Sequence, residues 1–70
     1  MTEIKAEMVA NVWKVLVTVG QAVATGDELV ILESMKMEIP IEAPIPGIVT
    51  SVHVIPDQVL NEGDLIAVIG

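Results

Sequence analysis

The chain has 70 residues, a formal net charge of −7 at pH 7 and no cysteine. This length predicts one small domain, residues 1–70, and the lack of cysteine excludes disulfides and thiolate metal sites. The negative charge argues against binding to nucleic acid or to an anionic membrane surface. No apolar run approaches the ~20 residues that a membrane span requires. We therefore expect a cytoplasmic protein that is monomeric in isolation.

The chain repeats itself when Gly26 is placed on Gly63. The identical pairs that then coincide, without a gap, include Val12 and Val49, Val15 and Val52, Val17 and Val54, Gln21 and Gln58, Gly26 and Gly63, and Asp27 and Asp64. Two similar halves predict a domain with quasi-two-fold symmetry, and two copies suit a closed sandwich or barrel better than a solenoid. Trp13 is the only aromatic residue, so the core must be built from Val, Ile and Leu, which favour strands.

In chain order, the valines of residues 15–19 alternate with other residues, and those of residues 52–54 do the same, so each half contains a predicted strand. The odd step from Val12 to Val15 recurs in the second half and predicts a β-bulge in each copy. Gly-Asp pairs predict turns before the apolar runs 28–32 and 65–69. We expect about eight short strands in all.

Residues 38–43 alternate apolar and polar side chains, which predicts a strand with a polar outer face. Pro40, Pro44 and Pro46 lack amide donors, so this stretch belongs at a sheet edge or a bend.

The segment before this strand has two interpretations. Residues 29–38 contain helix-forming Leu, Glu, Met and Lys, but Pro40 would end a helix there. The repeat also requires residues 29–32 to behave like the branched run 66–69. We therefore predict antiparallel strands at 28–32 and 38–43, connected through residues 34–37.

Lys36 lies in this predicted connection and is the only Lys or Arg after Lys14. Tight hairpin turns need positive φ and favour Gly or Asn, so Met35 and Lys36 would adopt this geometry at a steric cost. A turn that breaks its local rule and exposes methionines is a candidate functional site. Its solvated amine would need an electrophile activated by a partner.

The segment Glu33-Ser34-Met35-Lys36-Met37 resembles the (Ala/Ser)-Met-Lys-Met attachment site of biotinyl domains, the carrier parts of biotin-dependent carboxylases and decarboxylases. Residues 19–23, 26–29, 43–49 and 63–65 are similar to the turns and strand starts of the same family, although Glu7 and Ala10 replace its usual Pro and Gly. The resemblance implies an all-β barrel-sandwich hybrid, a flattened barrel of two four-stranded antiparallel sheets. Lys36 would protrude on a hairpin at the end opposite the termini.

The implied function is that of a biotin carrier without catalytic activity of its own. A biotin protein ligase would attach biotin covalently to Lys36, and Met35 and Met37 would pack against the cofactor. The resemblance assigns ligase recognition to Glu33, Ser34, Met35, Met37 and Glu38. Biotin carboxylase and carboxyltransferase components would be the further partners.

Two alternatives of function remain open. Lipoyl domains share the fold but usually carry Asp-Lys-Ala at the turn, so lipoate fits less well than biotin. An unmodified adaptor with the same fold is the other alternative. If the turn has no function, Met35 and Met37 fill the core, and Glu33 and Glu38 only make the turn soluble. His53 stands alone, which supports neither phosphotransfer nor a metal site.

Overall fold

The computed structural model describes all 70 residues, which form strands and turns without any helix. No helix of a length and apolarity that could cross a membrane is therefore present. The strands are β1 (Thr2–Lys5), β2 (Ala10–Val15), β3 (Ala22–Val23), β4 (Glu28–Ser34), β5 (Met37–Glu42), β6 (Gly47–Val52), β7 (Val59–Leu60) and β8 (Leu65–Ile69).

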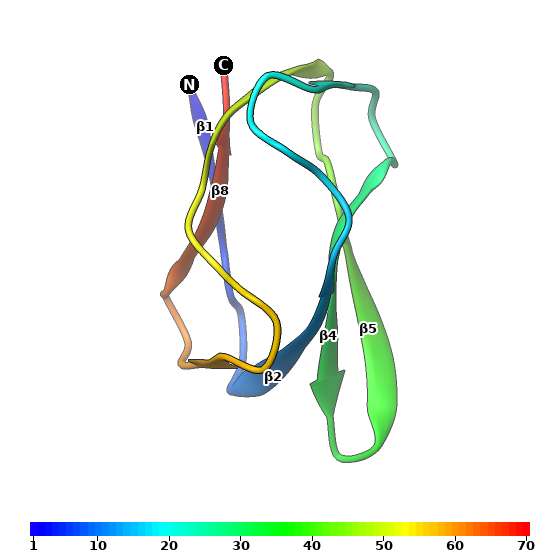
Figure 1. Cartoon of the computed structure of the whole chain (residues 1–70), viewed down its shortest axis with the longest axis vertical. Helices are drawn as coiled ribbons and strands as arrows, with labels where there is room; N and C mark the ends of the chain where they lie inside the picture. Colours follow the sequence, from blue (N-terminus) through cyan, green and yellow to red (C-terminus); the bar gives the residue numbers. More distant parts are fainter.

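The strands build two four-stranded sheets, with the orders β1-β8-β6-β3 and β5-β4-β2-β7, and every pair is antiparallel. The predicted fold class is confirmed. The alignment of the two halves places β2 on β6, β3 on β7 and β4 on β8, so it exchanges one sheet for the other. Figure 1 shows both termini at one end of the molecule and the β4–β5 hairpin at the other. The expected position of the hairpin, opposite the termini, is therefore confirmed.

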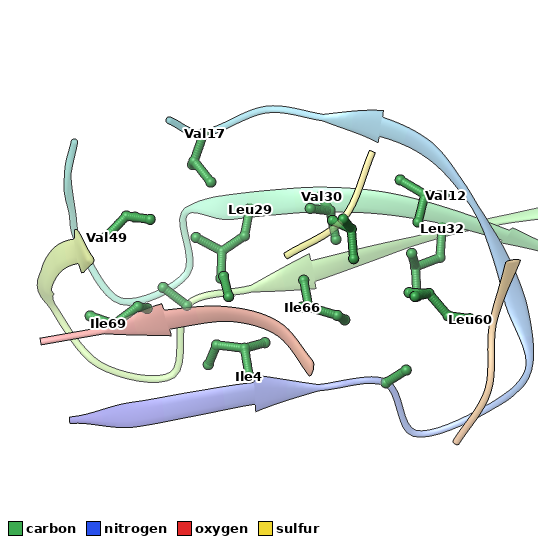
Figure 2. Close-up of a cluster of buried hydrophobic side chains, with 14 of the residues drawn as sticks. Ile4, Val12, Val17, Leu29, Val30, Leu32, Val49, Leu60, Ile66 and Ile69 are labelled. Atoms are coloured by element: carbon green, nitrogen blue, oxygen red, sulfur yellow. The ribbon is translucent and has the colours of Figure 1, made fainter. Parts of the chain in front are cut away.

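The identical valines of the repeat are core residues. Val12, Val17, Val49 and Val54 are buried, and Val15 and Val52 pack against the core from its margin. Figure 2 shows aliphatic side chains from both sheets meeting in this core, among them Leu29, Leu32, Leu60, Ile66 and Ile69. Burial of a Leu, Ile or Val side chain stabilises a fold by about 1.5–3 kcal/mol. In this domain, burial of aliphatic side chains therefore takes the place of the aromatic residues and disulfides that stabilise other small domains.

The polar residues that are identical in the two halves close turns. The Gln21 side chain accepts a hydrogen bond from the Thr18 amide, and Gln58 accepts one from Ile55 at the equivalent place. Asp27 and Asp64 accept in the same way from the amides of Ala24 and Asn61. A carboxylate or carboxamide that satisfies a turn amide fixes that turn. The repeated polar residues are thus structural.

The glycines of the Gly-Asp pairs, Gly26 and Gly63, have the same positive φ of 91°. Gly20 has a φ of 93°, and its counterpart Asp57 has a φ of 70°. Asp is one of the few residues that adopts left-handed geometry at modest cost, so the turn at Asp57 is retained.

Two pairs of β-bulges bend the sheets. The predicted pair is confirmed by register shifts between Val12 and Lys14 and between Val49 and Ser51. A second pair, opposite Glu42–Ile41 and Lys5–Ile4, lies at the buried residues Leu29 and Ile66 and was not predicted. Leu29 begins the apolar run 29–32 and Ile66 lies in the apolar run 65–69, so no break in alternation marks the extra residue. Bulges increase strand twist, which helps two small sheets to close around one core.

The strand around Pro40 lies where its prolines predict. β5 is an edge strand, and Glu38, Pro40 and Glu42 are exposed while Ile39 and Ile41 are half-buried. The helical interpretation of residues 29–38 is wrong. The predicted strands also run further than expected, because β4 continues to Ser34 and β5 begins at Met37.

Gly47 generates the first prediction. A Cβ atom at this position would lie 2.6 Å from Cγ2 of Ile69 and 2.9 Å from the Gly70 carbonyl oxygen. Ile69 is fully buried, and Gly70 is held by two backbone hydrogen bonds to Ile48, so neither can retreat. We expect Gly47→Ala to destabilise the fold by roughly 1–3 kcal/mol and to lower the melting temperature by about 5–15 °C. Thermal unfolding followed by circular dichroism measures the loss.

Ile48→Ala is the control, because it shortens an exposed side chain in the same strand. We expect it to lower the stability of the fold less than Gly47→Ala does. Equal melting temperatures for Gly47→Ala and the wild type would contradict the close approach of Gly47 to the C-terminal strand.

Candidate functional site

The candidate site is the turn between β4 and β5. Ser34 and Met37 form the last cross-strand pair, so the turn consists of Met35 and Lys36 alone. Both have positive φ, 53° and 64°, as a two-residue turn of the type I′ class requires. This geometry costs a residue with a Cβ about 1–2 kcal/mol. Met35 and Lys36 therefore adopt the unfavourable positive φ that we predicted. The turn is shorter than the predicted connection of residues 34–37.

The turn presents both methionines to solvent. Met35 is 92% exposed and Met37 is 65% exposed. Their assignment to the core is therefore wrong, since neither contributes to the buried cluster. Thioether side chains that stay outside the core offer an adaptable apolar surface to a partner.

Lys36 is the one lysine without a partner in the chain. The ammonium of Lys5 lies 3.6 Å from Glu3, and the ammonium of Lys14 lies 4.4 Å from the centroid of the Trp13 ring. Lys36 is exposed and makes no ion pair, although Glu33 and Glu38 are close in sequence. Its amine is therefore free to react without first losing an intramolecular contact.

Glu33 and Glu38 face each other directly across the hairpin, and both are exposed. Like charges in a cross-strand pair destabilise a sheet modestly. A second acidic pair, Glu28 and Glu42, lies at the other end of the same strands. The hairpin thus carries a negative outer face beside its single free ammonium.

Ser34 has a structural role that its sequence position does not reveal. It is half-buried, and its hydroxyl donates a hydrogen bond of 3.4 Å to the carbonyl oxygen of Val9, in the connection between β1 and β2. The two residues are 25 positions apart. The bond ties the base of the turn to the end of the barrel. Sequence reasoning missed Val9, because no local pattern reports a contact over this separation.

His53 lies away from this turn, in the segment that follows β6. The residue is exposed, and its Nε2 lies 2.8 Å from the Ser51 hydroxyl. His53 therefore does not lie with the candidate residues of the attachment turn.

Comparison with known proteins gives the same picture over nearly the whole chain. The model of the family described as "Biotin-requiring enzyme" matches residues 2–69. The chain is 52% identical over 67 residues to the biotinylated protein TB7.3 homolog of Mycobacterium leprae, covering 96% of this chain and 94% of that one. It is 46% identical over 63 residues to the biotin/lipoyl attachment protein of Bacillus subtilis, covering 90% of this chain and 86% of that one.

Among solved structures, the urea carboxylase of Kluyveromyces lactis contains a matching region with a TM-score of 0.91 and 32% identity. The match covers 99% of this chain but only 6% of the carboxylase. The chain belongs to the biotin- and lipoyl-attachment family of biotin-requiring enzymes, and within that family it is a biotin carrier domain.

Proposed function

We propose that Lys36 is the residue to which biotin is attached, and that a biotin protein ligase attaches it. The observation that carries this assignment is the free, exposed amine at the tip of a two-residue turn. Lys5 and Lys14 contact Glu3 and Trp13 and lie on strands rather than at a protruding tip. The residues around Lys36 fit the cofactor, since exposed methionines flank the amine on both sides.

The attachment step needs only the lysine from this chain. The ligase presents biotin as an acyl-adenylate, and the Lys36 amine, after loss of a proton, attacks its carbonyl carbon. An amide bond forms, the bond to the phosphate oxygen breaks, and AMP leaves. The amide carries no charge, so the domain loses one positive charge at the turn.

The flanking residues would present Lys36 to the ligase. Met35 and Met37 offer apolar contacts that rearrange easily against a partner. Glu33 and Glu38 would face basic residues of the ligase and accelerate its encounter with this acidic domain. Ser34 would act differently from a surface contact, because its hydroxyl is already engaged with Val9.

We infer that the loaded domain serves a biotin-dependent carboxylase, like the urea carboxylase that contains a similar domain. When bound, biotin supplies the nitrogen that carries a carboxyl group, and the reactions occur in the partner enzymes. This chain supplies a rigid barrel with the attachment residue at one end. A tether raises the local concentration of the carried group, to the mM range for short linkers. Carboxylase and carboxyltransferase components would thus be the partners after the ligase.

Lys36→Arg is expected to abolish biotin incorporation, because the guanidinium keeps the positive charge but is not a competent amine nucleophile. The measurement is the intact mass of the protein after incubation with a purified biotin protein ligase, biotin and ATP. The wild type should gain one biotinyl group and the variant none.

Lys5→Arg and Lys14→Arg are the matched controls for this experiment, and both should gain one biotinyl group. Equal melting temperatures would show that Lys36→Arg folds. A biotinylated Lys36→Arg protein, or a wild type left unmodified by an active ligase, would refute the assignment.

Met35→Asn is expected to separate stability from modification. Asn adopts positive φ more readily than Met, and the exposed Met35 has little packing to lose, so the variant should gain about 0.5–1 kcal/mol of stability. The loss of the thioether should lower kcat/KM of biotinylation by about tenfold. Chemical denaturation and ligase kinetics measure the two effects.

Asp57→Gly is the control for the backbone effect, since Asp57 also has positive φ but lies in the β6–β7 connection. It should change stability without changing biotinylation. A Met35→Asn protein that is modified at the wild-type rate would show that Met35 is not read by the ligase.

A further inference from the structure

An apolar step lies beside the attachment turn and takes no part in the core. It consists of Met8 and Val9, in the connection between β1 and β2, and we call it the apolar step. Met8 is 40% exposed and Val9 is 60% exposed. Neither belongs to the buried cluster, so packing does not explain why this connection carries large apolar side chains.

The apolar step is joined to the attachment turn through Ser34. The Ser34 hydroxyl bonds to the Val9 carbonyl, and Ser34 is the direct cross-strand partner of Met37. Ser34 therefore has Val9 on one side and Met37 on the other. Figure 1 shows the start of β2 at the same end of the molecule as the β4–β5 turn, with the turn extending beyond it. The apolar step thus lies beside the base of the turn that carries the exposed methionines.

We propose that the apolar step is part of the docking surface for the biotin protein ligase. This inference rests on the proposed modification of Lys36. An enzyme that acylates Lys36 must bring its active site over the tip of the turn, and the turn stands only one cross-strand pair above the bond to Val9. The residues of the ligase that surround its active site would therefore lie beside Ser34, where they would contact the apolar step.

The chemistry of the step suits such a contact. Thioether and branched aliphatic side chains gain binding free energy when a partner removes them from water. The step lies beside the reacting amine rather than on it, so its contacts are the same before and during amide formation. Interactions of this kind change KM and leave kcat unaltered. The bond from Ser34 to Val9 would hold the step and the turn in one fixed arrangement and spare the ligase the cost of ordering them.

The internal repeat supplies a matched control. Ile45 is the counterpart of Met8, and it is also 40% exposed. It lies in the β5–β6 connection. This connection is at the end of the molecule that holds both termini, far from the attachment turn (Figure 1). A substitution at Ile45 thus removes an apolar side chain with the exposure of Met8 from the opposite end of the barrel.

The experiment compares wild type, the double variant Met8→Ser/Val9→Ser, and Ile45→Ser as substrates of a purified biotin protein ligase. Initial rates of biotinylation are measured by intact mass over a range of carrier concentrations. We expect the double variant to show a rise in KM of roughly three- to tenfold with kcat retained. Ile45→Ser should match the wild type. Melting temperatures verify that all three proteins are folded at the assay temperature.

The outcomes separate this inference from the assignment of Lys36. A wild type that is not biotinylated would refute the attachment site itself. A folded double variant with the KM of the wild type would overturn the docking role of the apolar step while Lys36 remained the site. A fall in kcat alone, or an equal rise in KM for Ile45→Ser, would also overturn it, since neither agrees with a local docking contact.

Discussion

The whole structure depends on two short sheets that bury one aliphatic core between them. Every large side chain that is fully buried is a Leu, Ile or Val, and the chain has no disulfide or aromatic cluster to add stability. A domain of this size has little core to spare. This explains why the residues that are identical in the two halves lie mostly in the core or in turns. The duplicated positions are those that the fold cannot do without.

The same economy explains where the function lies. Exposed positions that differ between the halves do not share this structural demand, and the attachment turn is the extreme case. The counterpart of the β4–β5 hairpin is the pair β8 and β1, which is open, because the two termini lie there (Figure 1). The barrel therefore has two ends of similar construction, and only one of them carries a closed turn. The repeated barrel holds the attachment turn in place, and this turn exists because the two ends of the barrel differ.

Much of this could be predicted from the sequence, because the repeat provides an internal alignment. It placed the strands and one pair of bulges. What it could not place were features without a local signature. The bulges at Leu29 and Ile66 are hidden in continuous apolar runs. The bond from Ser34 to Val9 joins segments far apart in the sequence, and the nearby apolar step became visible only in three dimensions.

The strain at Met35 and Lys36 argues that the turn was selected for use rather than for stability. Gly or Asn at these positions would relieve two unfavourable φ angles, and neither methionine repays the cost through packing. The cross-strand repulsion of Glu33 and Glu38 adds to the cost. A small domain has little stability to give away, so such losses must be offset by a gain outside the chain. The residues that stabilise the turn least, the exposed methionines and the free lysine, are therefore the ones that a partner has most reason to recognise.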